Sequence, residues 1–405
     1  MNQLNKDQKL ALLGASLYYM GLGGFLYNSQ STVLAAVRAQ YDFPMTRISL
    51  YTTMGYVAAV LGTVLFGSMI FRLSQSPKKW YFIGMLSSGA LGVFLLACFA
   101  DTPLFYASFA LLSFATSTIS IITAYVINQW IRENAGTVIG ISAASAGVGG
   151  MIGNPVASAL LERFSLQNGV LILLAIAVLI SGTGIVLMFR KPIPEGDPIP
   201  AGQEVKTGGT KPSAKRLLVM SVLLGIVVAG PRTVLLFVSY LSMFAQSNGF
   251  SPAFGAALSS VLMFGNITSK LVYGYLSDHI GTWKATFLFQ GLVMVGVLLF
   301  ILFPGSAVSL GIGTLCYGMM YALVNIGVNR MALAAYGYEG LKKYQGPLMS
   351  IGSIVAAAAS PVVGIMFDRT GSFRPYFLML VGIMSLCMVL TGVVARMRAK
   401  DGVLS

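Results

Sequence analysis

Three basic residues stand inside long runs of apolar residues, where a charge needs either a partner or water. Arg232 lies in LLGIVVAGPRTVLLFVSY, Lys270 lies in FGNITSKLVYGYLSD, and Arg330 comes about 23 residues into a third run. The twelve carboxylates all fall in loops, tails or the ends of such runs, and so does the single histidine, His279. Buried cations without buried anions indicate an anion-binding site, in which the ligand supplies the counter-charge.

The composition indicates that these runs cross a membrane. The 405 residues are 56% hydrophobic and only 9% charged, with a mean hydropathy of +0.80. A soluble domain carries about 25% charged residues, because charged side chains cover its surface. Continuous apolar runs of about 20 residues favour membrane-spanning helices over a β-barrel. The first run is too long for a secretory signal and lacks a cleavage site of small residues.

We therefore expect an all-α membrane protein with about twelve transmembrane helices. The expected spans are 11–33, 47–70, 80–99, 103–129, 136–160, 168–189, 217–245, 253–276, 284–303, 307–333, 347–367 and 375–396.

Helix geometry places the basic residues at different depths. At 1.5 Å per residue, Arg232 lies about 24 Å beyond Arg216, near the middle of its span. Lys270 lies about 12 Å from Asp278, which follows the same span. Arg330 is deep enough along its helix to reach the far interface as an anchor. The structural alternative is that Arg232 or Lys270 binds backbone carbonyls, such as those freed by Gly230–Pro231. Pro231 also removes one backbone hydrogen bond, so a bend that assists gating is expected there.

The distribution of positive charge predicts the orientation of the chain. Of the 26 Lys and Arg residues, 18 fall on the side that holds both termini, five on the other side and three within spans. The positive-inside rule then places both termini in the cytoplasm. This bias explains the net charge of +14 without a nucleic-acid partner.

The chain reads as two halves joined by a linker. Residues 190–216 are rich in proline, glycine and charge, as expected for a cytoplasmic linker between a six-helix bundle at 1–189 and another at 217–405. PVASALLERF, from Pro155, is echoed by PVVGIMFDRT, from Pro361, at an offset of 206 residues. Such a repeat suggests duplicated bundles on either side of a central cavity. Gly136, Gly140, Gly149 and Gly153 have the spacing of helix-packing glycines.

The segment GYLSDHIGTWK, from Gly274 to Lys284, resembles the loop signature of the major facilitator superfamily. Gly274, Asp278, Gly281 and Lys284 match that signature, and the resemblance implies a conformational latch at these residues. The equivalent place in the first half, GSMIFRLSQSPKK, has Phe71 where the acid would fall. The resemblance covers essentially the whole chain and implies the major facilitator fold, with two six-helix bundles and alternating access.

A second resemblance narrows the branch. NQWIRENAGTVIGISAASAGVGGMIGNP is similar to the helix 4–5 segment of monocarboxylate porters and oxalate/formate antiporter-like proteins. In that branch a cation on helix 8 binds the substrate carboxylate, and Lys270 occupies this position, where arginine is usual. Asn266 stands where proton-coupled porters carry an aspartate. The helix 11 lysine of oxalate carriers is absent from GPLMSIGSIVAAAAS, which disfavours oxalate.

The resemblance also implies which helices line the cavity. The expected substrate-binding residues are the cations Lys270 and Arg232, the amide of Asn266, and polar or aromatic residues of other cavity helices. The latter include Tyr19, Tyr27, Asn28, Tyr125, Asn128 and Tyr321. A tyrosine can donate to a carboxylate while its ring packs against the substrate body. Each is about as well explained by packing or by an interfacial anchor.

These observations predict a secondary active or facilitative transporter of a small organic anion, a mono- or dicarboxylate, which works by exchange or uniport. We expect no enzymatic activity, no cofactor and no metal, and a carrier that functions as a monomer in the lipid bilayer. No nucleotide-binding motif is present, and the three cysteines show no disulfide or zinc pattern. A polyspecific exporter of amphipathic compounds and a transporter-like receptor that moves nothing are the alternatives. By analogy with carriers that lack further domains, the expected location is the bacterial inner membrane.

Overall fold

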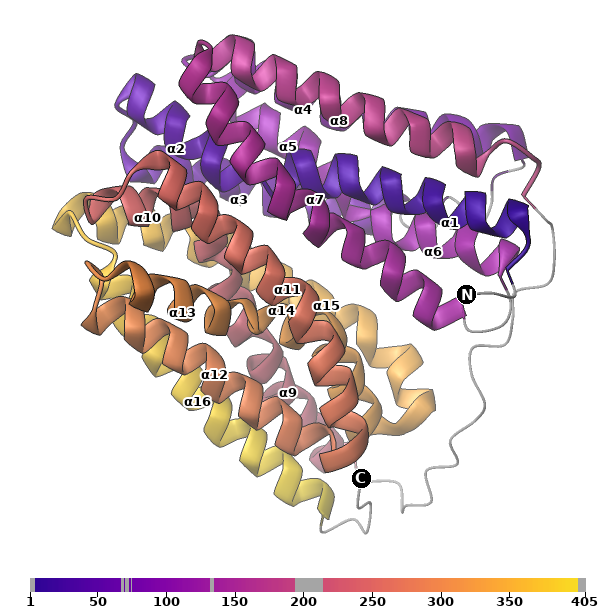
Figure 1. Ribbon diagram of the computed structural model, residues 1–405. Coiled ribbons are helices and arrows are strands. Elements are labelled where there is room, and N and C mark those ends of the chain that lie inside the picture. Colours follow the sequence, from indigo (N-terminus) through magenta and orange to yellow (C-terminus); the bar gives the residue numbers. More distant parts are fainter. Residues whose placement is uncertain are drawn as a thin grey trace. The chain divides into compact units, whose positions relative to one another are not determined.

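The computed structural model describes residues 4–66, 69, 73, 75–131, 135–193 and 214–399 (Figure 1). These residues are helical throughout their regular structure and form no strand. Each of the twelve expected spans falls, in its described residues, on a helix or on a series of consecutive helices. Ten helical segments of the described chain are long and apolar enough to cross a membrane. The expected spans 136–160 and 253–276 lie on two further helices that are richer in small and polar residues.

The first part of the chain forms α1 (Lys6–Tyr18), the π-helix η1 (Tyr19–Tyr27), α2 (Gln30–Tyr41), α3 (Met45–Phe66), α4 (Gln75–Phe99), α5 (Leu104–Ser117), α6 (Ile119–Trp130), α7 (Ala135–Arg163) and α8 (Leu166–Met188). The rest forms α9 (Ala214–Leu235), the 3-10 helix η3 (Leu236–Tyr240), α10 (Leu241–Ser247), α11 (Pro252–Ile280), α12 (Thr282–Leu302), α13 (Ala307–Gly318), α14 (Met320–Ala322), the π-helix η4 (Leu323–Gly327), α15 (Val328–Thr370) and α16 (Arg374–Ala399).

The chain divides into two compact units. Unit 1 comprises Met1–Ala201, Ser239–Gln246 and Phe250–Met263, and unit 2 comprises Gly202–Val238, Ser247–Gly249 and Phe264–Ser405. Two short segments of the second half therefore belong to unit 1. The expected division into bundles on either side of 190–216 stays a prediction.

Glycines allow close helix packing inside unit 1. A Cβ on Gly24 of η1 would lie 2.5 Å from the Cα of Gly149 in α7, so the two backbones touch where neither residue has a side chain. Gly153, one turn further along α7, would meet the hydroxyl of Ser29 at 2.6 Å. Packing thus accounts for Gly149 and Gly153. Gly140 meets nothing within 4 Å, so this explanation does not extend to it.

Polar contacts attach the two short segments to the rest of unit 1. The Thr52 hydroxyl of α3 lies 3.0 Å from that of Tyr240, and the Ser31 hydroxyl of α2 lies 2.8 Å from that of Ser259. Ser260 donates to the Met151 carbonyl of α7 at 2.9 Å. Each pair joins residues that are far apart in the sequence, so these contacts are tertiary.

Unit 2 has an apolar core between α9 and the start of α15. Its fully buried members include Leu224 and Val227 of α9 and Val328 and Ala332 of α15. The ring of Phe237 lies within 5.4 Å of the rings of Phe373 and Phe377, measured between centroids, and extends aromatic packing to α16. Figure 1 shows α12 and α16, which contact each other, running side by side.

The structure differs most from the expected spans between the tenth and the eleventh. Residues 334–346, expected to separate two spans, are helical, so α15 runs without a break from Val328 to Thr370. Pro347 lies inside this helix, where it cannot donate a backbone hydrogen bond. Apolarity decides which residues enter the membrane, but a polar connection can remain helical because helical hydrogen bonds are local.

The sequence echo has a structural counterpart. Pro155 lies inside α7, which ends at Arg163, and Pro361 lies inside α15, which ends at Thr370. A second correspondence was not expected: the helix pair α5–α6 is interrupted at Thr118, and α13–α14 at Met319.

Candidate functional site

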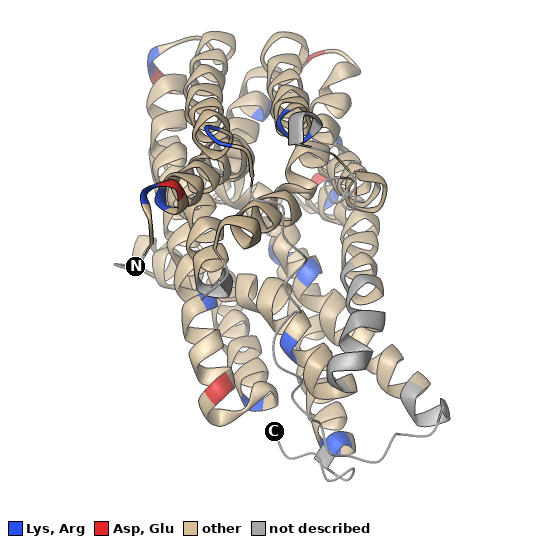
Figure 2. Ribbon diagram, turned by 90° about the vertical axis from the view of Figure 1, so that its right-hand side faces the viewer, with Lys and Arg blue, Asp and Glu red and all other residues tan. Residues whose placement is uncertain are grey.

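Charges in the described ribbon are distributed unevenly. In Figure 2 the acidic residues lie near helix ends and turns, whereas basic residues also occur along helices. Among the described residues, partly exposed side chains form the ion pairs Lys191–Asp7 and Arg330–Asp278. Lys191 lies 2.6 Å from Asp7, and Arg330 lies 2.8 Å from Asp278. Lys270 belongs to neither pair.

Lys270 lies in the second half of α11, in unit 2, with its side chain half-buried. Within the described residues its ammonium group makes no hydrogen bond and no ion pair. The residues within one helical turn of Lys270 carry no charge, and the one acid of α11, Asp278, lies eight residues further on and pairs with Arg330. A partly desolvated ammonium with three donors is therefore open to an anionic ligand.

Asn266 lies one helical turn before Lys270 and is buried. Its backbone carbonyl accepts a hydrogen bond from the Ser269 hydroxyl at 3.0 Å. The spacing of four residues puts the amide and the ammonium on the same face of α11. An amide cannot take up a proton at physiological pH, so this pair offers charge and hydrogen bonding but no proton relay.

Arg232 lies in α9, half-buried, one residue after Pro231. Its side chain passes across Gly352 of α15: a Cβ at Gly352 would lie 2.7 Å from Cγ, 3.5 Å from Cδ and 3.4 Å from Nε. Any larger residue at position 352 would displace the arginine near its base, where the side chain has little freedom. Gly352 therefore sets the path of the Arg232 side chain.

The helix around Pro231 changes type within one turn. α9 ends at Leu235 and the 3-10 helix η3 follows, so carbonyls just beyond the proline lose their regular helical partners. Tyrosine hydroxyls replace these partners: Tyr376 donates to the Thr233 carbonyl at 2.6 Å, and Tyr317 donates to the Val234 carbonyl. This local irregularity lies next to Arg232, and Pro231 remains a proposed hinge.

The residues of the loop signature lie at the junction of α11 and α12. Gly281 adopts a φ of 88°, a conformation that favours glycine, and this permits the sharp turn between the helices. Asp278 accepts from Arg330 of α15, so the residue expected to be an interfacial anchor pairs with the signature acid. A Cβ on Gly274 would meet nothing within 4 Å, and Lys284 lies exposed on α12.

The remaining expected site residue of unit 2 is Tyr321, in the short α14. It is half-buried, and its carbonyl accepts from Asn325 at 2.8 Å.

The expected site residues of unit 1 have varied surroundings. Tyr19 is buried in η1, and the ring of Tyr27 stacks on Phe109 at 5.7 Å. Asn28 donates to the Ala146 carbonyl at 2.9 Å, so part of its amide holds the end of η1 against α7. Asn128 is exposed on α6.

Tyr125 has a partner that the sequence does not suggest. The hydroxyl of Tyr125 accepts a 2.8 Å hydrogen bond from Lys78 of α4, and the Lys78 ammonium lies 4.9 Å from the centre of the Tyr125 ring. Lys78 is only 3% exposed. By the positive-inside rule, Lys78 is one of the 18 basic residues expected on the cytoplasmic side.

The structure therefore keeps Lys270 and Asn266 one turn apart on the same helix, α11, and pairs Asp278 with Arg330. It also places Gly352 against the side chain of Arg232, and Lys78 within hydrogen-bond distance of the Tyr125 hydroxyl. Gly352 carried only a weak signal in the sequence, as a glycine in a span. The Lys78–Tyr125 and Asp278–Arg330 pairs carried none, because their partners belong to different helices.

Comparison with known proteins defines the class. The family described as Major Facilitator Superfamily matches residues 11–341. The chain belongs to this superfamily and is a multi-pass membrane transporter, not an enzyme. No curated protein matches the chain.

Solved structures of the same fold are distant in sequence. A nucleoside transporter, NupG, is 15% identical, with a TM-score of 0.73, over 96% of this chain and 99% of that one. A mutant of the same nucleoside transporter is 16% identical, with a TM-score of 0.71, over 95% and 99%. A bacterial homologue of the human lysosomal transporter Spinster, in an inward-facing and unoccupied conformation, is 13% identical, with a TM-score of 0.72, over 98% of each chain. These structures confirm the all-α major facilitator fold. The monocarboxylate and oxalate/formate branch remains a prediction.

Proposed function

We propose that the protein is a secondary carrier of a small organic anion, a mono- or dicarboxylate, which it moves by exchange or uniport. The observation that carries the proposal is the Lys270 ammonium, half-buried on α11 and without a hydrogen bond or ion pair among the described residues. A charge at this depth is costly unless a counter-ion or water compensates it. A substrate carboxylate is the simplest counter-ion.

Arg232 is the second cation of the proposed site. Its guanidinium can hold a carboxylate through two parallel hydrogen bonds, whereas Lys270 acts as a point charge. A dicarboxylate would engage both cations, and a monocarboxylate would need only one. Gly352 supports this role because it lets the arginine side chain cross α15 along a defined path.

The neutral Asn266 argues against proton coupling through this pair. Asn266→Asp is expected to weaken anion binding increasingly as the pH rises, because the new carboxyl group ionises and either pairs with Lys270 or repels the substrate. The affinity of the wild-type protein should lack this pH dependence. Substrate binding measured between about pH 5 and 8 tests the expectation, and identical pH profiles for the two proteins would contradict it.

Uptake into proteoliposomes tests the function itself. The panel should contain labelled mono- and dicarboxylates, with nucleosides included because NupG is a nucleoside transporter of the same fold. Counterflow of a carboxylate supports the proposal. Three results would contradict the proposal and indicate a different function. They are nucleoside flux, export of amphipathic dyes alone, and ligand binding without any flux.

For the orientation, we propose a bacterial inner-membrane location with both termini cytoplasmic, based on the charge bias of 18 to five. Cysteines introduced singly at Ser165 and Val205 should react with an impermeant reagent from opposite sides of the membrane. Labelling of both from the same side would exclude this topology.

A further inference from the structure

A groove lies between α12 and α16 of unit 2, and neither Lys270 nor Arg232 lines it. Its volume is about 330 Å³, within the range of about 300–1,000 Å³ common for small-molecule sites. Its wall on α12 and its floor on α16 are formed largely by apolar atoms. The groove is lined by Trp283, Lys284, Phe287, Leu288, Thr391, Gly392 and Ala395.

A missing side chain keeps the groove open. A Cβ at Gly392 would meet nothing within 4 Å, so the space above α16 is empty at that position. On the opposite wall, Phe287 is 48% exposed and Leu288 is 45% exposed. Thr391, which also lines the groove, donates its hydroxyl to the Cys387 carbonyl at 2.8 Å and bonds to Gln290, so that hydroxyl needs no partner from the groove. The groove therefore favours a hydrocarbon chain.

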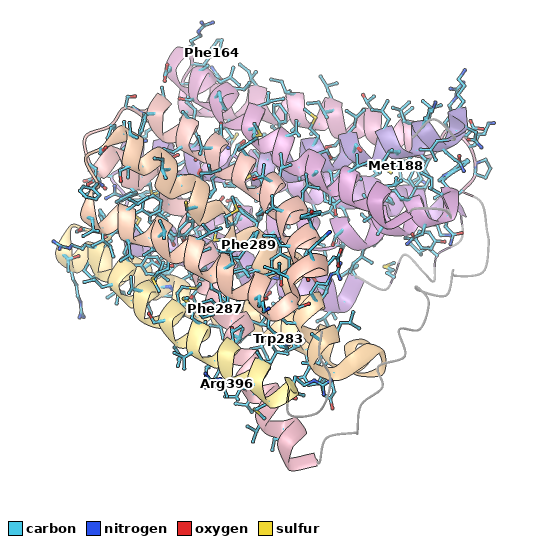
Figure 3. The ribbon with its side chains drawn as sticks, turned by 60° about the horizontal axis from the view of Figure 1, so that its bottom comes forward. Phe164, Met188, Trp283, Phe287, Phe289 and Arg396 are labelled. Atoms are coloured by element: carbon cyan, nitrogen blue, oxygen red, sulfur yellow. The ribbon has the colours of Figure 1, made fainter. Side chains whose placement is uncertain are left out.

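Two basic side chains, Lys284 and Arg396, lie at one end of this apolar groove. Lys284 lines it and is exposed, and Arg396 is exposed one helical turn after Gly392. Figure 3 shows Trp283, Phe287 and Arg396 toward the same end of the α12–α16 pair. Arg398, by contrast, is buried and donates to the Ala334 carbonyl of α15 at 3.2 Å, so it is held inward. Among the described residues that line the groove there is no acid.

We propose that this groove binds one anionic phospholipid of the membrane leaflet on the side where α12 begins. One acyl chain lies along Phe287, Leu288 and Gly392, and the phosphate group contacts Lys284 and Arg396. Trp283 lies at the level of the headgroup, where amphipathic aromatic rings are favoured. Basic residues beside an apolar interhelical groove are the combination that anionic lipids recognise.

The test uses the full chain, purified in detergent, with bound lipid counted by native mass spectrometry. Phosphatidylglycerol and phosphatidylcholine with the same acyl chains are added separately at equal concentration. The wild-type protein should retain phosphatidylglycerol in preference. Lys284→Gln and Arg396→Gln should each weaken that retention about fivefold, without changing retention of phosphatidylcholine. Lys79→Gln, at an exposed lysine of α4, is the matched control and should change neither.

A second pair of variants tests the acyl-chain part of the site. Gly392→Phe should fill the groove and lower retention of both lipids. Gly382→Phe is the control on the same helix, since a Cβ there also meets nothing within 4 Å. If Gly392→Phe does not fold, Gly392→Leu replaces it. Glycerophosphate, a headgroup without chains, should not displace the lipid.

Several outcomes would overturn the proposal. The first is that the wild-type protein retains the two phospholipids equally. The second is that the Lys284→Gln/Arg396→Gln double variant retains phosphatidylglycerol as well as the wild-type protein does. The third is that glycerophosphate at matched concentration displaces the lipid. None of them bears on the carboxylate site, because none involves Lys270 or Arg232.

Discussion

Lys78 and Lys270 are both lysines that lie at least partly buried, but the surroundings of their ammonium groups differ. Lys78 is 3% exposed, donates to the Tyr125 hydroxyl at 2.8 Å and lies over the Tyr125 ring. Lys270 is half-buried and, within the described residues, has neither a hydrogen bond nor an ion pair. The first cation is part of the protein's own packing. The second has no such partner among the described residues, which is why we propose that the substrate binds there.

Neutralising Lys270 is expected to have the largest effect. Lys270→Gln should lower apparent carboxylate affinity by roughly one to two orders of magnitude, since a charge-assisted contact contributes about 1.5–3 kcal/mol. Lys270→Arg should retain part of the affinity because the charge survives. Binding isotherms and melting temperatures should be measured on the same purified samples. If Lys270→Gln keeps wild-type affinity, or loses affinity only because it melts early, Lys270 does not bind the substrate and no longer differs from Lys78 in role.

Neutralising Lys78 should instead affect stability. Lys78→Gln and Tyr125→Phe should each destabilise the protein by about 1–3 kcal/mol, because each removes a buried hydrogen bond to a charged group. The double variant should cost less than the sum of the two, since both remove the same contact. Thermal unfolding measures this. A tenfold loss of substrate affinity in Lys78→Gln at unchanged stability would place Lys78 in the site instead.

Gly352→Ala probes the second cation without removing it. The added methyl group forces Arg232 off its path, and an off-rotamer side chain costs about 0.5–1.5 kcal/mol, so affinity should fall roughly two- to tenfold. Gly225→Ala is the control, since its Cβ would have only Ile351 within 4 Å, at 3.9 Å. Arg232→Gln should abolish the effect of Gly352→Ala. If the Gly352→Ala penalty persists in that background, the glycine acts on packing and not through Arg232.

The smallest effect is expected at the junction of α11 and α12. The Asp278–Arg330 pair is partly exposed, with side chains 54% and 37% accessible, so water screens it. Asp278→Asn should therefore reduce stability by less than about 1 kcal/mol and leave substrate affinity unchanged. Chemical denaturation and binding assays check this. A large loss of substrate affinity in Asp278→Asn would instead indicate that the loop signature is coupled to the proposed substrate site.

The sequence alone determined the properties that depend on composition along the chain. Apolar runs predicted where helices long enough to span a membrane would lie, because insertion into a membrane depends on the local density of apolar side chains. The absence of acids from the spans drew attention to Arg232 and Lys270, and the loop signature from Gly274 to Lys284 predicted the superfamily.

The tertiary structure decided which side chains are already satisfied. Lys78 and Tyr125 are 47 residues apart, and Gly352 and Arg232 are 120 residues apart. No spacing rule links residues on different helices, because helix periodicity specifies only which residues share a face of the same helix. Hydropathy likewise did not predict that α15 continues through 334–346, since backbone hydrogen bonds keep a helix intact whether its side chains meet lipid or water. The sequence could therefore locate the cations, but only packing distinguished Lys78, which binds the Tyr125 hydroxyl, from Lys270, which has no hydrogen bond or ion pair among the described residues.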